Sequence, residues 1–72
     1  MKKPQAKYRK GEELVLTYDP RLNAKVLAIY YKATDNQYYY KVNRYNANGF
    51  TDLTWISEPY LRKARYLNDI RY

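Results

Sequence analysis

Residues 37–56 read QYYYKVNRYNANGFTDLTWI, and this stretch decides the fold. It is rich in aromatic residues and contains the only Trp of the chain. Tyr and Val suit a pleated, half-buried surface, so residues 37–44 are predicted to form a strand. Alternation along that strand places Tyr38, Tyr40 and Val42 on one face and the residues between them on the other. Tyr40, Val42 and Trp55 are expected to be mainly structural.

The middle of the stretch predicts a turn. Asn48-Gly49 is a strong turn signal because both residues tolerate a positive φ. Residues 51–56 are then expected to return as a short strand and to complete a hairpin. Tyr45 and Phe50 flank the polar turn, where packing against a core is least available. Clustered exposed aromatic rings at a loop indicate a binding site.

Two further strands are predicted before this hairpin. Residues 12–18, EELVLTY, alternate in period two, and Asp19-Pro20 ends them because Pro cannot donate to a strand ladder. Residues 24–31, AKVLAIYY, are apolar on both faces, which indicates a central or strongly curved strand. A helix is the competing interpretation of residues 24–31, and their β-branched residues and paired Tyr favour a strand.

A helix is predicted at the C-terminal end. Ser57 is a candidate cap, and Pro59 fits a first helical turn. Apolar residues then recur at helical spacing, at Tyr60, Leu61, Ala64 and Leu67. The expected fold is therefore mainly β, a small curved antiparallel β-barrel with a C-terminal α-helix. Residues 1–9 are expected to form a flexible basic arm, and residues 10–72 a single domain.

Composition excludes several functions. The chain contains no Cys and no His, which removes thiolate metal ligands and the commonest general base. We therefore expect neither an enzyme nor a metal or cofactor site. Fourteen Lys and Arg against seven Asp and Glu give a net charge of +7, which favours polyanionic partners, nucleic acid first. No apolar run approaches the roughly 20 residues of a membrane span, so no membrane association is expected.

Several segments, taken in order, resemble chromo barrel domains. Residues 10–20, KGEELVLTYDP, resemble the opening strand and turn of that family, and residues 24–27, AKVL, its second strand. The series YYKV at 39–42, DLTWI at 52–56 and SEPYL at 57–61 resembles the remaining strands and the step into the helix. The resemblance covers about residues 9–65. It implies a Tudor-like or Src-homology-3-like barrel of the MYST acetyltransferase, MRG or male-specific-lethal type.

The resemblance implies a chromatin-associated, nuclear module, which we expect to be a monomer. One interpretation is nucleic-acid binding, to RNA or DNA, with cations on phosphates and rings stacked on bases. The residues expected to contribute are Lys41, Arg44, Tyr45, Phe50, Arg62, Lys63 and Arg65.

The alternative is a methyl-lysine reader of histone tails, with an aromatic cage drawn from Tyr18, Tyr45, Phe50 and Trp55. Arg44 beside Tyr45 would repel a cation there, and its guanidinium suits a phosphate or a base plane. A third interpretation is an interaction module that holds a histone acetyltransferase or deacetylase complex together.

Overall fold

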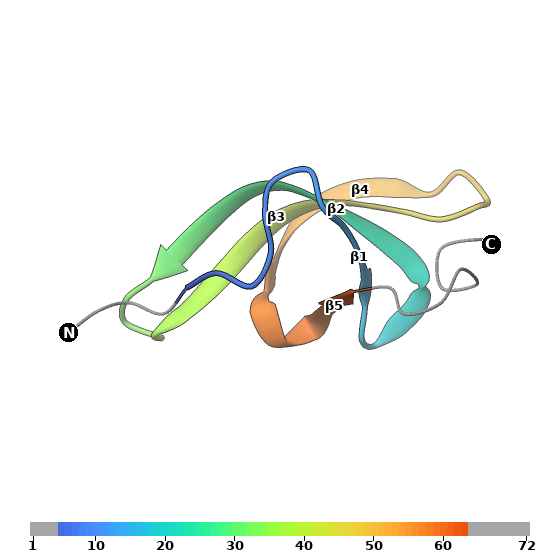
Figure 1. Ribbon diagram of the computed structural model, residues 1–72. Helices are drawn as coiled ribbons and strands as arrows, with labels where there is room; N and C mark the ends of the chain where they lie inside the picture. The colour runs from blue at the N-terminus through green and yellow to red at the C-terminus, as the bar shows by residue number, and fades with distance from the viewer. Residues whose placement is uncertain (1–4, 64–72) are drawn as a thin grey trace.

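Five strands form one antiparallel sheet in the computed structural model, which describes residues 5–63 (Figure 1). The elements are β1 (Glu13–Leu16), β2 (Asp19–Lys32), β3 (Gln37–Tyr45), β4 (Thr51–Ser57), the 3₁₀ turn η1 (Glu58–Tyr60) and β5 (Leu61–Lys63). The mainly β prediction is confirmed, including the hairpin of β3 and β4 around the Asn48-Gly49 turn.

The sheet curls back on itself without closing. Its strand order is β4-β3-β2-β1-β5, so the last strand returns to pair with the first. Leu61 of β5 lies opposite Leu16 of β1. In Figure 1 the chain leaves β4, passes beneath the sheet through η1 and reaches β5 from below. Within residues 5–63, β4 and β5 remain the two edges of the sheet, and no pairing joins them.

The long strand β2 supplies much of the curvature. Its register with β3 shifts between Val26 and Ala28, which leaves Leu27 as an extra residue. A bulge of this kind bends its strand and increases the local twist. Beyond the bulge, β2 and β3 continue as a hairpin that projects past the rest of the sheet, at the left of Figure 1.

The concave face of the sheet carries the core. Tyr38, Tyr40 and Val42 share the buried face. The expectation that Tyr40 and Val42 are structural is confirmed, whereas the same expectation for Trp55 is wrong, because Trp55 is 49% exposed. The three buried residues pack with side chains from the other strands and from the segment before β1, namely Tyr8, Leu14, Leu16, Ala24, Val26, Ile56 and Leu61. The hydroxyl of Tyr40 donates to the carboxylate of Glu58, so this buried polar group is satisfied.

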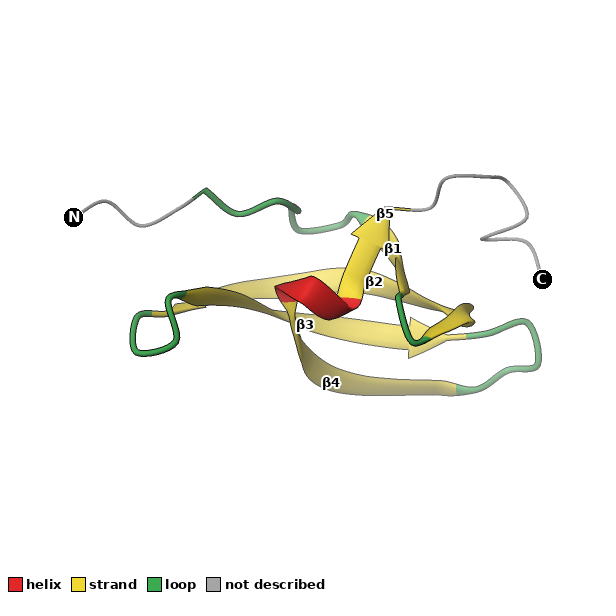
Figure 2. Cartoon of the chain, turned by 90° about the horizontal axis from the view of Figure 1, so that it is seen from below, coloured by secondary structure: helices red, strands yellow, loops and turns green. Residues whose placement is uncertain are grey.

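The helix predicted after Pro59 does not form in the described residues. Figure 2 shows η1 in red between β4 and β5, a single 3₁₀ turn with Pro near its start. Ser57 makes no capping hydrogen bond through its side chain. Leu61 is 3% exposed and lies in the core, so pairing with β1 overrides the helical spacing of the local sequence. The rest of the predicted helix, from Ala64 onward, lies outside the described residues.

The segment before β1 belongs to the fold from residue 5. Tyr8 is 7% exposed, and its ring lies 5.5 Å from that of Tyr40, edge to face. Its hydroxyl donates to the carbonyl oxygen of Leu61 at 3.0 Å. Residues 1–9 were expected to form a flexible basic arm, and Tyr8 within that range packs into the core.

Candidate functional site

The convex face of β2, β3 and β4 carries exposed aromatic rings. The alternation that buries Tyr38 and Tyr40 turns Tyr39 and Lys41 outward. Across the sheet, Tyr39 lies opposite Tyr30 of β2, and Lys41 lies opposite Trp55 of β4. Cross-strand neighbours share a face, so these four side chains lie together on the outside of the molecule.

A shallow groove runs between these rings, with a volume of about 500 Å³. We call it the aromatic groove, and it is lined by Tyr30, Lys32, Tyr39 and Trp55. The rings of Tyr30 and Trp55 lie 6.4 Å apart with an interplanar angle of 76°. Tyr30 is 55% exposed and Trp55 49% exposed, so a flat ligand could reach part of each ring.

Asp35 fixes the rim of the aromatic groove. Its carboxylate accepts a hydrogen bond from the Tyr39 hydroxyl at 2.8 Å and lies 3.6 Å from the ammonium of Lys32. The hydrogen bond to Asp35 raises the pKa of Tyr39. The Lys32 ammonium lies 5.9 Å from the centre of the Tyr39 ring, within cation–π range. Within residues 5–63, Lys41 has no ion-pair partner, so its charge is available to a ligand.

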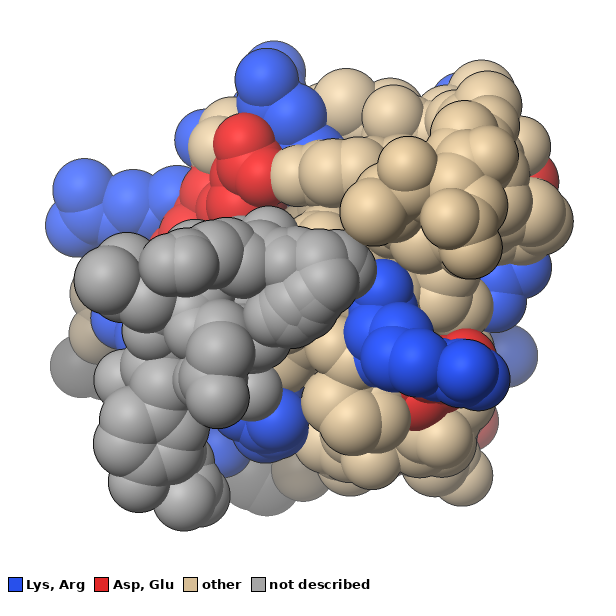
Figure 3. All heavy atoms as spheres, turned by 90° about the vertical axis from the view of Figure 1, so that its right-hand side faces the viewer, with Lys and Arg blue, Asp and Glu red and all other residues tan. Residues whose placement is uncertain are grey.

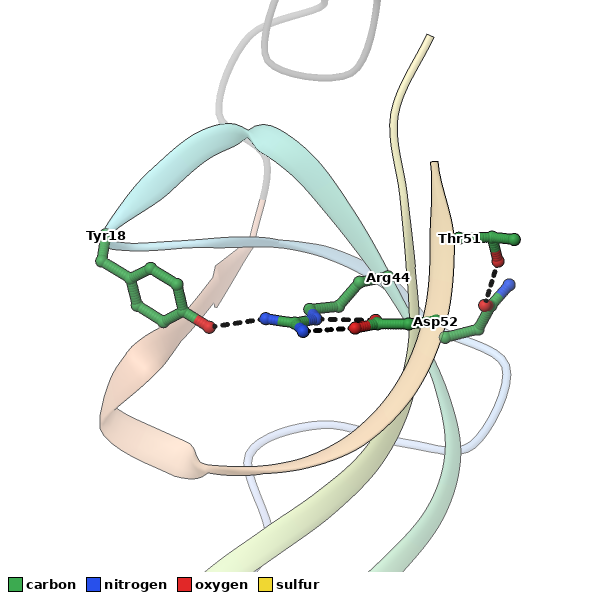
Figure 4. Close-up of polar contacts among 5 residues, drawn as sticks. Tyr18, Arg44, Thr51 and Asp52 are labelled. Carbon is green, nitrogen blue, oxygen red and sulfur yellow. Dashed lines mark hydrogen bonds and ion pairs between the residues drawn. The ribbon is translucent and has the colours of Figure 1, made fainter. Parts of the chain in front are cut away.

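Arg44 has its own protein partners on the opposite, concave face. Its Nε donates to Asp52 at 2.9 Å, its Nη2 donates to the second oxygen of the same carboxylate, and its Nη1 donates to the Tyr18 hydroxyl at 3.3 Å (Figure 4). The two-pronged contact with Asp52 raises the pKa of Arg44 and lowers that of Asp52. The guanidinium that was expected to meet a phosphate is thus already matched by a carboxylate.

The four rings of the predicted cage do not line one cavity. Tyr18 packs edge to face against Tyr60, with ring centres 6.0 Å apart, on the side of Arg44. Trp55 packs against Tyr30 on the convex face. Tyr45 shares that convex face two outward positions beyond Lys41, and Phe50 is exposed in the turn after it.

Tyr45 is tied to β1. Its hydroxyl donates to the carboxylate of Glu13. Burial and this hydrogen bond raise the pKa of Tyr45 to about 12. Tyr45 therefore connects β3 to β1. Its position beside a turn did not indicate this structural role.

Two of the three basic residues expected on a helix lie on β5 instead. Arg62 and Lys63 are its second and third residues, and Arg65 lies outside the described residues. The Lys63 ammonium lies 3.6 Å from the Glu12 carboxylate. Figure 3 shows Lys and Arg spread over one face of the molecule with acidic side chains among them, so the positive charge does not gather in one patch there.

Comparisons with protein-family models, with curated proteins and with solved structures found no match. Residues 5–63 contain no group of three or more carboxylates placed to hold a metal ion. In the same residues, no helix is long and apolar enough to cross a membrane.

Three of the four residues that line the aromatic groove were missed by the sequence analysis. Trp55 and Lys41 were predicted as site residues, whereas Tyr30, Lys32 and Tyr39 were not. The signal that could have found them is the short turn around Asp35, because it sets the register that places Tyr30 opposite Tyr39.

Proposed function

We propose that this domain binds single-stranded nucleic acid, RNA or DNA, on the convex face of β2, β3 and β4. The observation that carries the proposal is the aromatic groove, which half-exposed rings of Tyr30 and Trp55 line together with Lys32, and beside which Lys41 lies opposite Trp55 in the sheet. Aromatic rings beside cations are how proteins hold unpaired bases and the phosphates between them.

Stacking and charge contribute separately to this binding. A base stacked on Trp55 or Tyr30 is worth about 1–3 kcal/mol, largely independent of base identity. The cations add a salt-dependent attraction, which the net charge of +7 strengthens. A duplex hides the faces of its bases, so the rings favour single strands.

The only Trp of the chain lies in the groove, so its fluorescence reports on the site directly. Titration with single-stranded oligouridylate is expected to quench Trp55. Tyr30→Ala is expected to weaken binding by about 1–3 kcal/mol and to leave the dependence of affinity on salt unchanged. Lys41→Ala is expected to reduce that salt dependence by about one phosphate contact.

Tyr60→Ala is the matched control, because Tyr60 is equally exposed, at 54%, yet pairs with Tyr18 away from the groove. Unquenched Trp55 fluorescence, or equal losses from Tyr30→Ala and Tyr60→Ala, would refute the proposal.

A methylated lysine of a histone tail is the second candidate ligand. It is favoured by Lys32, whose ammonium already lies beside the Tyr39 ring, so the groove accommodates a cation. Lys32→Ala separates the two functions, because it should strengthen binding of a trimethyl-lysine peptide and weaken binding of RNA. Equal affinity for methylated and unmodified peptides would exclude this reader function.

The finer fold and the cellular context are proposals as well. The return of β5 to β1 through η1 supports a small barrel of the Tudor-like kind, in which the strand edges approach each other. Chromatin association, a nuclear location and membership of an acetyltransferase or deacetylase complex rest on the resemblance to chromo barrels. Nuclear accumulation of the labelled full chain in cells would test the location.

A further inference from the structure

A second candidate site lies where the segment before β1 meets β5. Tyr8 anchors this segment in the core, and the backbone N–H of Lys7 donates to the Glu58 carboxylate at 3.2 Å. Lys7 and Arg9 flank the buried Tyr8, and both are exposed. The anchored ring and the backbone contacts therefore fix the positions from which the Lys7 and Arg9 side chains extend.

A tight turn from Arg9 to Glu12 forms one side of this site. The N–H of Glu12 donates to the carbonyl oxygen of Arg9 at 3.1 Å, and the N–H of Arg9 donates to the Glu12 carboxylate at 3.0 Å. Gly11 has a φ of +88°, a conformation that glycine adopts without strain. The turn thus places Lys10 beside Arg9, and both line the same hollow as Lys63 of β5.

These groups enclose a polar cleft of about 620 Å³, which we call the basic cleft. It is lined by Gln5, Ala6, Lys7, Arg9, Lys10, Glu12 and Lys63. Four cations thus face a single carboxylate, and that carboxylate is shared between Lys63 and the Arg9 turn. Within residues 5–63, the side chains of Lys7, Arg9 and Lys10 have no ion-pair partner.

We propose that the basic cleft binds a phosphate-type oxyanion. A phosphoryl group carries up to two negative charges and three strong acceptor oxygens, so it can engage several convergent cations at once, whereas a carboxylate has only one charge to offer. None of the cleft residues lines the aromatic groove, so the inference does not depend on nucleic-acid binding there.

The test uses the full chain and inorganic pyrophosphate, followed by calorimetry and by the amide resonances of residues 5–12 and 61–63. The double variant Lys7→Ala/Arg9→Ala is expected to lower the affinity at least about tenfold, because it removes two charge-assisted contacts. The matched control is Arg21→Ala/Lys25→Ala, which removes the same charge from exposed positions of β2 outside the cleft. It is expected to lower the affinity by less than about twofold.

Equal losses in the two double variants would overturn the proposal, because net charge alone would then explain the binding. Resonance shifts spread over the whole sheet, or no binding of pyrophosphate, would overturn it too. A second arm measures single-stranded RNA by Trp55 quenching. If Lys7→Ala/Arg9→Ala also weakens RNA binding, the cleft takes a phosphate of the RNA backbone. If only pyrophosphate binding falls, the cleft serves a separate phosphorylated ligand.

Discussion

Arg44 illustrates how the partners of one side chain decide its role. Sequence alone places a cation beside Tyr45 at a turn, which suits a phosphate. In the fold, cross-strand pairing brings Arg44 opposite Asp52, and the planar guanidinium fits that carboxylate with two parallel contacts. Tyr18 then takes one of its remaining donors. Arg44 therefore links β3, β4 and the turn after β1.

The Arg44–Asp52 pair predicts a sensitivity to acid. Arg44 holds the pKa of Asp52 below its ordinary value of 3.8, so the charged carboxylate stabilises the folded state above that pH. This contribution is lost as the pH falls through the lowered pKa. Asp52→Asn is expected to flatten the acid limb of a plot of unfolding free energy, measured in urea, against pH. Arg44→Lys keeps the charge without the two-pronged contact, so the slope of its acid limb should lie between those of the wild type and Asp52→Asn. Identical acid limbs for Asp52→Asn and the wild type would contradict the prediction.

The buried hydroxyl of Tyr40 gives a second prediction at this scale. Tyr40→Phe removes the hydrogen bond to Glu58 in a fully buried position, with an expected loss of about 1–2 kcal/mol in the free energy of unfolding. Tyr30→Phe is the control, because the Tyr30 ring is exposed and its change should stay within about 0.5 kcal/mol. Urea unfolding of both variants measures the difference, and equal losses would show that the Glu58 contact contributes nothing.

At the scale of the element, β5 is the part of the fold that local pattern misjudged. Only three residues pair with β1, yet Leu61 fills the core from that strand. Leu61→Ala is expected to lower the free energy of unfolding by about 2–4 kcal/mol. Leu53→Ala, at a position that is 60% exposed on β4, should change it by less than about 0.5 kcal/mol. A small loss at Leu61, measured by urea unfolding, would mean that β5 does not close the core.

The hairpin and β5 show which parts of the fold could be predicted from the sequence. Alternation in residues 37–44 is a local signal, and it correctly separated the two faces of β3. The pairing of Leu61 with Leu16 joins distant segments, and no window of sequence contains both partners. Helical spacing from residue 60 onward was the only signal in reach, and tertiary pairing overrode it in residues 61–63.

The residues of the candidate site likewise fall into those that a local sequence signal identifies and those that only strand pairing brings together. Trp55 and Lys41 could be assigned from strand alternation and residue type. Tyr30 and Lys32 join them only through the register of a neighbouring strand, which the bulge at Leu27 shifts by one residue. The basic cleft depends on Tyr8 entering the core, and composition had marked that segment as a free basic arm.

At the scale of the whole molecule, the raised pKa values of several tyrosines predict that the free energy of unfolding falls at alkaline pH. The pKa values of Tyr8, Tyr40 and Tyr45 are all raised above the ordinary 10.0, to about 12 at Tyr45. Their protonated forms therefore stabilise the fold fully below about pH 10, and this stability falls as the pH rises toward the raised values. The free energy of unfolding should decline steeply above about pH 10, and the triple variant with Phe at these positions should decline less. Equal slopes for the wild type and the triple variant would refute this prediction.

The hydrogen bond from Tyr8 to Leu61 joins residues 53 positions apart, and the strand pairing of β1 with β5 spans a similar distance. A ribosome delivers the chain from its N-terminus, so Tyr8 and β1 emerge long before their partners do. Until Leu61 has left the exit tunnel, the nascent chain exposes a half-built core with an unpaired β1 edge. Folding is then expected as one late event after β5 emerges, and at the slower rates typical of β topologies with many non-local contacts.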